Sequence, residues 1–231
     1  MSERPILFSA PMVRAVLEGR KTQTRRLFKV RGPMGNLCQI DSPDEEIIRM
    51  DDGSFHYLST SEMSGPYPCP YGAPGERLWV RETFAIGGAK GDPPAYRADM
   101  SADDLAEERE VRRLAPGLSK EYRNARWRPS IHMPRWASRI TLEVTGVRVE
   151  RLHEISYEDA CAEGCAIPSL EVPAIETATL PAASAESWDE TSRRLRWPQR
   201  CYEQLWDSIN GAESWAANPW VWVIEFKRVT Q

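Results

Sequence analysis

A run of eight residues near the N-terminus gathers the side chains best suited to chemistry. Residues 19–26 contain one lysine, two threonines and three arginines. A lysine amine surrounded by guanidinium groups loses its proton more readily than a free amine, because like charges disfavour the charged form. A neutral amine beside a hydroxyl can remove the hydroxyl proton and so generate a nucleophile. The same composition is typical of a solvated basic turn, so Lys21 and Thr24 are candidates on residue type alone.

The segment before this run predicts a strand and then a short helix. Residues 5–8 form an apolar run, Ser9 can cap the helix, and Gly19 is expected to end it. Lys21 and Thr24 therefore lie in a loop or an early strand. A local turn or the tertiary structure must bring them together.

Later segments predict the elements that complete the core. Residues 140–149 alternate between apolar and other side chains, which predicts a long strand. Ser156 is expected to begin a helix, with Asp159 in a position like that of the capping box. Residues 188–209 have helical character, which Pro198 is expected to interrupt.

Three stretches are expected to be insertions in one domain that spans residues 1–231. Residues 31–76 combine Gly and Pro punctuation with an acidic segment, and residues 86–137 hold a polar segment followed by an aromatic and basic one. Residues 166–187 are rich in Ala, Pro, Ser and Thr. One core with two or three insertions is the simplest organisation.

Composition and charge limit the classes of function. Hydrophobic residues make up 41% and charged residues 28% of the chain, which is ordinary for a globular protein. No apolar run reaches the roughly 18–20 residues that span a bilayer, and the first residues lack the apolar core of a secretory signal. We therefore expect a cytoplasmic protein without a membrane partner. The net charge of −4 argues against a protein whose main task is to hold a long nucleic acid.

The cysteines and histidines do not predict a metal site. Five cysteines are an odd number without the spacing of a small disulfide framework, which suits a reducing compartment. Cys161 and Cys165 could share a helix face, but a zinc site needs two further ligands, and the three histidines are scattered. We expect buried structural thiols, no metal and no other cofactor.

The basic run carries a resemblance to a known family. The pattern Gly19-x-Lys21-x-x-x-x-Arg26 resembles the signature of the ASCH domains, small β-barrels related to the PUA fold. Residues 17–24 resemble the same region of the small bacterial ASCH enzymes that hydrolyse N4-acetylcytidine. Two further stretches follow in the same order. Residues 141–145, leading into residues 155–164, resemble that family's central strand and following helix, and residues 221–227 resemble its closing strand. The resemblance implies an α+β fold, namely a PUA-like (ASCH) β-barrel with flanking helices and the insertions above.

The resemblance also implies roles for three residues. The family's lysine and threonine fall on Lys21 and Thr24, and its glutamate matches Glu163. Lys21 then accepts the hydroxyl proton of Thr24, whose oxygen attacks the acyl carbonyl on cytosine N4. Glu163 then protonates the departing amine. The first step requires a lowered pKa for Lys21, and the second requires a raised pKa for Glu163. In a second mechanism Glu163 activates water and Thr24 only orients the substrate. The residues do not decide between the two.

Three further residues are candidates for substrate binding. Arg26 could stabilise an oxyanion or hold the cytosine carbonyl. Arg81 follows a predicted strand, and His132 lies among aromatic residues between two prolines. For Arg81 and His132 a structural role is the alternative interpretation.

The expected function is a metal-independent amidohydrolase that removes acyl groups from N4 of cytidine or cytosine. Its ligand is an acylated pyrimidine nucleoside or nucleobase, with RNA as a further possibility, and no obligate protein partner is implied. The alternatives are an RNA-binding module without catalysis and a ribonuclease that uses the same basic cleft. Binding alone requires the basic residues but neither the hydroxyl of Thr24 nor the carboxyl of Glu163, so their joint presence favours the hydrolase.

Overall fold

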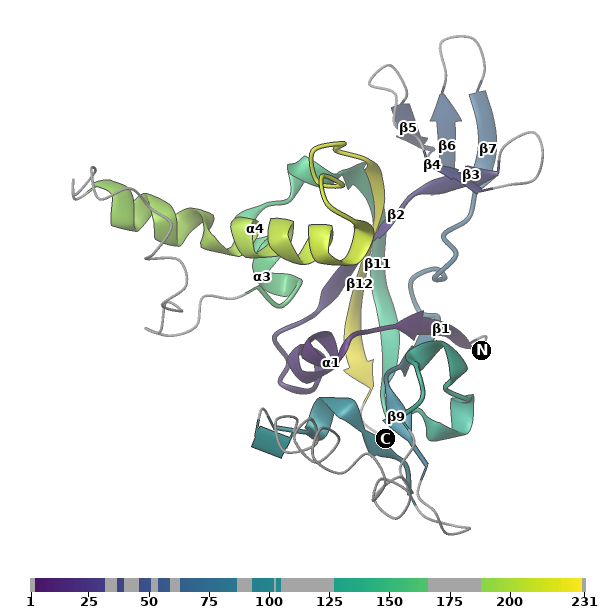
Figure 1. The fold of residues 1–231 in the computed structure, drawn as a ribbon. Coiled ribbons are helices and arrows are strands. Elements are labelled where there is room, and N and C mark those ends of the chain that lie inside the picture. The colour runs from purple at the N-terminus through teal and green to yellow at the C-terminus, as the bar shows by residue number, and fades with distance from the viewer. Residues whose placement is uncertain are drawn as a thin grey trace. The chain divides into compact units, whose positions relative to one another are not determined.

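The computed structural model of the chain is a mixed α+β structure (Figure 1). It describes residues 3–31, 37–39, 46–50, 54–58, 63–86, 93–101, 103–104, 127–165 and 188–229. The predicted insertion at 166–187 lies outside these residues. No described helix combines the length and apolar character needed to cross a membrane.

Five strands form the main sheet, hydrogen-bonded in the order β1-β8-β11-β12-β2. β1 pairs with β8 in parallel, β11 pairs with β8 antiparallel, and β12 pairs with β2 antiparallel. The α+β class is therefore confirmed, and no closed barrel is found among the described strands. The strand bounds are β1 (Glu3–Leu7), β2 (Gln23–Leu27), β8 (Arg77–Arg81), β11 (Thr141–Arg151) and β12 (Trp220–Val229).

The chain divides into two compact units. Unit 1 comprises Met1–Gly19, Tyr71–Val144 and Phe226–Gln231, and unit 2 comprises Arg20–Pro70 and Thr145–Glu225. The long strands β11 and β12 each contribute residues to both units.

In unit 1, the predicted first helix is present as α1 (Ala10–Leu17). Ser9 occupies the position before its first residue, although the Ser9 side chain makes no capping hydrogen bond. The chain leaves the helix through Gly19 at a φ of 75°, a left-handed conformation that glycine adopts without strain. This confirms that Lys21 lies beyond the helix.

The core of unit 1 follows the alternation predicted from the sequence. Ile140, Leu142 and Val144 are each at most 1% exposed, and Leu78 and Val80 on β8 are equally buried. A smaller cluster is built from Phe84, Met133 and Ala137. The described part of this unit also contains β9 (Phe84–Ala85) paired with β10 (Ala95–Tyr96), and the 3-10 helices η1 (Arg97–Asp99), η4 (Ser130–His132) and η5 (Arg135–Ala137).

In unit 2, the predicted capping box is present at the start of α3 (Tyr157–Ala162). The backbone N–H of Asp159 donates to the Ser156 hydroxyl at 3.0 Å, and the Asp159 carboxylate accepts from the backbone N–H of Ser156 at 3.5 Å. Aspartate therefore replaces the usual Glu or Gln of this motif. A 3-10 turn, η6 (Leu152–Glu154), connects β11 to this region.

The predicted interruption at Pro198 is wrong. Helix α4 (Trp188–Asn210) continues through Pro198. Proline removes one backbone hydrogen bond and crowds the carbonyl four residues earlier. Here the proline ring is buried, and the turns that follow place Tyr202 and Trp206 in the core, so packing offsets the lost bond.

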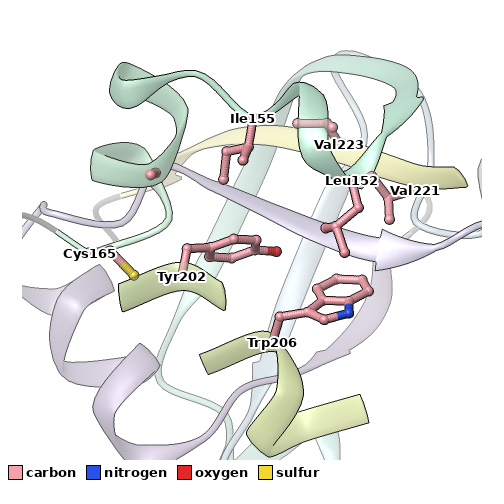
Figure 2. Close-up of a cluster of buried hydrophobic side chains, with 8 residues drawn as sticks. Leu152, Ile155, Cys165, Tyr202, Trp206, Val221 and Val223 are labelled. Carbon is pink, nitrogen blue, oxygen red and sulfur yellow. The ribbon is translucent and has the colours of Figure 1, made fainter. Parts of the chain in front are cut away.

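The core of unit 2 is formed where α4 packs against η6, α3 and the start of β12 (Figure 2). Tyr202 and Trp206 are each 3% exposed and supply the largest side chains of this cluster. Their rings lie 6.2 Å apart between centroids. The buried members are Leu152, Ile155, Ala160, Cys165, Tyr202, Trp206, Val221 and Val223.

We expect Trp206→Ala to lower the free energy of unfolding by about 3–5 kcal/mol, because truncating a buried tryptophan removes contacts and leaves a cavity. Urea denaturation followed by circular dichroism measures the change. Trp136 is the matched control, since its side chain is 66% exposed, and Trp136→Ala should change stability by no more than about 0.5 kcal/mol. Equal losses in the two variants would contradict the placement of Trp206.

The predicted insertion at 31–76 carries two small antiparallel sheets in unit 2. One pairs β3 with β4, and the other has the order β5-β6-β7. Phe55 packs edge-on against Trp222 with 4.9 Å between ring centroids, so this segment contributes to the core of the unit. The bounds are β3 (Lys29–Arg31), β4 (Leu37–Gln39), β5 (Glu46–Arg49), β6 (Phe55–Leu58) and β7 (Met63–Tyr67).

Candidate active site

Lys21 and Glu163, which lie far apart in the sequence, are brought together in unit 2 by backbone pairing. Lys21 lies just before β2, and Glu163 follows the last residue of α3. The two residues form an isolated antiparallel bridge, and the N–H of Thr22 donates to the carbonyl of Ala162 at 2.8 Å. The start of β2 is thus held against the end of α3.

The two side chains form a buried ion pair. Nζ of Lys21 donates to Oε2 of Glu163 at 2.5 Å and to the Glu163 carbonyl oxygen at 2.9 Å. The side chains are 0% and 1% exposed. Burial lowers the pKa of Lys21 from its ordinary value, although the charge of Glu163 acts in the opposite direction. A lysine that gives up its proton more readily suits proton transfer near neutral pH.

Arg25 occupies the other oxygen of Glu163. Its Nη1 lies 3.3 Å from Oε1 of Glu163, and its Nη2 lies 2.5 Å from Glu150 and 3.0 Å from Asp159. Burial alone would lower the pKa of Arg25, but the charges of Glu163 and Glu150 raise it overall. Glu163 therefore bridges Lys21 and Arg25, with one carboxylate oxygen on each side chain.

Arg148 extends this network toward the surface of unit 2. It donates to Glu150 at 2.9 Å, to Asp159 at 2.8 Å and to Glu225. Four members of this network are absent from the site residues predicted from the sequence: Arg25, Arg148, Glu150 and Asp159. A signal was available, because Arg148 lies in the predicted strand 140–149 and Glu150 directly follows that strand. Two residues apart in an extended chain, their side chains point to the same face.

Thr24 is not brought to the ion pair. Gln23 and Arg25 both contact Asp159 of α3, so this face of β2 is the one directed toward α3. Successive side chains of a strand point to opposite faces. Thr24, which is 2% exposed, therefore lies on the other face of β2, together with Arg26.

The second face of β2 lies beside apolar residues of β12. Thr24 is paired with Ile224 and Arg26 with Trp222 across the ladder to β12. The ring of Phe28, just after β2, lies 4.7 Å from that of Trp222. The expected substrate contact of Arg26 is therefore on a different face from Glu163.

Arg81 and His132, the other two candidates, belong to unit 1. Arg81 donates to the carbonyl of Ile131 and lies over the ring of Trp79 at 5.4 Å. His132 is exposed at the end of η4. These contacts fit the structural interpretation of Arg81.

Unit 2 also contains a cavity of about 270 Å³. Its wall includes the ring of His153, which lies 4.8 Å from the ring of Trp215, and no sequence-predicted site residue is among its lining residues. The described residues contain no cluster of three or more His, Cys, Asp or Glu side chains that could hold a metal ion. The cavity is lined by His153, Ile155, Gln199, Arg200, Glu203 and Trp215.

Comparison of the chain with protein-family models, with curated proteins and with solved structures gives no match.

Proposed function

We propose that the chain is an ASCH-type, PUA-like protein that acts as a metal-independent amidohydrolase on N4-acylated cytidine or cytosine. The observation that carries the proposal is the contact between Lys21 and Glu163. Nζ of Lys21 lies 2.5 Å from Oε2 of Glu163, although the two residues are 142 positions apart in the sequence. The motif resemblance selected both residues independently of any structure. The matched segments include β2, the start of β11, α3 and the start of β12.

Amide hydrolysis requires an acceptor for the proton of the nucleophile and a donor for the departing amine. The ionised carboxylate of Glu163 can take a proton from water as the water oxygen bonds to the acyl carbon. Lys21 can then give its proton to N4 as the bond between the acyl carbon and N4 breaks. The proton held by Glu163 returns to Lys21 across their hydrogen bond, which restores the pair.

This route is favoured over attack by Thr24, because strand alternation places the Thr24 hydroxyl on the opposite face of β2 from Arg25. Arg25 has a positioning role, since it holds the second oxygen of Glu163. The side chains of Lys21 and Glu163 are enclosed, so the substrate must displace covering residues before it meets them. A dry site of this kind strengthens electrostatic interactions with the substrate.

In the test, the purified protein is incubated with N4-acetylcytidine and with N4-benzoylcytidine in the presence of EDTA. Cytidine release is measured by chromatography. We expect release by the wild type and by Thr24→Ala, and none by Glu163→Gln. Loss of activity in Thr24→Ala, with its fold intact by circular dichroism, would instead support an acyl-threonine route. No release of cytidine from either compound would overturn the proposal.

The pH dependence separates the two routes. If Lys21 is the proton donor, kcat/KM falls as pH rises through the pKa of Lys21, which burial places below the ordinary lysine value of about 10.4. If Lys21 is instead the proton acceptor, kcat/KM rises over the same range. We expect the fall. Lys21→Arg should remove this alkaline limb at a reduced rate, because a guanidinium stays protonated throughout.

The buried position of Lys21 also bears on the RNA-binding alternatives. A lysine with no exposed side-chain surface cannot contact a phosphate backbone in this conformation. RNA binding that survives Lys21→Met, without cytidine release from either nucleoside, is the result that would favour a binding module instead.

A further inference from the structure

The cavity of unit 2 carries side chains of both charges on one side of α4. Three of its lining residues belong to this helix, namely Gln199, Arg200 and Glu203. Gln199 and Glu203 are four positions apart and Arg200 and Glu203 are three apart, spacings at which side chains on a helix are neighbours. Arg200 is exposed, whereas Gln199 and Glu203 are half-buried. The helix therefore presents a guanidinium and a carboxylate to the same small space.

The two charges are not used elsewhere in the described part of the chain. Among the residues that the structure describes, neither Arg200 nor Glu203 forms an ion pair or a hydrogen bond through its side chain. Their spacing on the helix would allow them to pair with each other, yet they do not. Both groups are thus available to a molecule that enters the cavity.

Gln199 adds an acceptor without a donor. Its Oε1 is buried and has no hydrogen-bond partner among the described residues. A buried acceptor that is left unpaired costs free energy, which a donor on a ligand would recover. The terminal torsion of a glutamine side chain is soft. A turn of this amide therefore presents Oε1 to the cavity beside the carboxylate of Glu203.

The rest of the wall is aromatic and apolar, and it is held in place by hydrogen bonds. Nε2 of His153 lies 2.8 Å from the carbonyl oxygen of Trp215, so this nitrogen carries the hydrogen, because a carbonyl only accepts. The backbone N–H of Trp215 donates to Asp207 at 2.8 Å, and that of His153 donates to the side chain of Asn218 at 2.8 Å. Ile155, which is buried in the hydrophobic core of the unit, completes the wall (Figure 2).

We propose that this cavity binds a free α-amino acid with an apolar side chain. The guanidinium of Arg200 pairs with the carboxylate of the ligand, for which its planar fork of N–H groups is suited. The ammonium group of the ligand donates to Glu203 and to Oε1 of Gln199. The apolar side chain of the ligand packs against Ile155 and Trp215.

The charges and the size of the cavity both favour this class of ligand. A ligand with one charge is attracted by one of Arg200 and Glu203 and repelled by the other, whereas a zwitterion is attracted by both. The volume of about 270 Å³ is below the roughly 300–1,000 Å³ of pockets that hold drug-sized molecules, so it suits a ligand as small as an amino acid. This site goes beyond the proposed hydrolase and does not depend on it.

The test is isothermal titration calorimetry of the full-length protein with L-leucine and with L-phenylalanine. We expect saturable binding of both. Two derivatives are matched controls, because N-acetyl-L-leucine lacks the ammonium group and L-leucinamide lacks the carboxylate. Each should bind about 10- to 100-fold more weakly than L-leucine, the effect of losing one charge-assisted hydrogen bond.

Two variants assign the charged groups. Arg200→Met should weaken the binding of L-leucine by about the same factor and leave that of L-leucinamide unchanged. Glu203→Gln should weaken the binding of L-leucine and leave that of N-acetyl-L-leucine unchanged. Glu158→Gln, which alters an exposed glutamate of α3, is the control and should bind all three like the wild type. A variant that had simply unfolded would not produce this crossed pattern.

Three outcomes overturn the inference. The first is the absence of saturable binding of either amino acid to the wild type, and the second is binding of the two derivatives as tightly as L-leucine. The third is competition between cytidine and L-leucine, which would assign the cavity to the nucleoside. Lys21→Met should bind L-leucine like the wild type, so failure of the hydrolase proposal and failure of this one are distinguishable.

Discussion

Glu163→Ala is expected to lower the free energy of unfolding by about 3–5 kcal/mol, because it leaves buried cations without their shared partner. Lys21 loses the acceptor of its 2.5 Å hydrogen bond, and Arg25 loses one of its three carboxylate contacts. Arg25 is the less affected of the two, since it keeps its contacts with Glu150 and Asp159. Urea denaturation of the variant against the wild type measures the loss.

The control for this prediction is the double variant Lys21→Met/Glu163→Leu. Replacing a buried ion pair by apolar side chains of similar volume is often neutral, because it removes the desolvation penalty together with the attraction. The double variant should therefore recover most of the stability that Glu163→Ala loses. A loss of less than about 1 kcal/mol in Glu163→Ala would show that the pair is not buried in solution.

Lys21→Met is expected to reduce cytidine release by about 100- to 10,000-fold, the contribution typical of one positioned proton-transfer group. Methionine is close to lysine in length and carries no proton to donate. Glu163 keeps Arg25 as a partner in this variant, so the fold should persist. The measurement is kcat/KM on the better of the two N4-acylated nucleosides.

Lys29→Met provides the matched control for Lys21→Met. Lys29 is exposed on β3, a few residues after Lys21 in the sequence, so its loss removes the same amount of positive charge from this part of the chain. We expect its kcat/KM within about twofold of the wild type, since surface substitutions rarely change more than about 0.5 kcal/mol. Equal loss in both variants would show that overall basic charge, and not a buried proton donor, drives the reaction.

The sequence predicts the local elements well because their signals are local. The helix that ends at Gly19, the capping box at Ser156 and the alternating strand through Leu142 each depend on residues a few positions apart. All three are present in the structure. The prediction at Pro198 was wrong because the side chains that pack against the helix beyond it come from segments distant in the sequence.

The candidate site is only partly predictable, for a related reason. Motif resemblance paired Lys21 with Glu163, but it also grouped Thr24 with them. Once β2 is known to begin at Gln23, alternation along the strand separates Thr24 from Arg25. The contacts of Arg25 with Glu150 and Asp159 join three separate segments, and no spacing within the sequence specifies them.

The position of Glu163 at the end of α3 has a consequence for how this part of the chain acquires its structure. A helix of six residues is too short to be stable alone in water, and its carboxyl end disfavours a negative side chain. Lys21 counters that charge, and the amide of Thr22 satisfies a carbonyl of the last helical turn. An excised peptide with the sequence of α3 should therefore be largely unstructured. In the intact protein, hydrogen exchange at the Thr22 amide would report the docking of β2, and the short helix should become ordered only when that docking occurs.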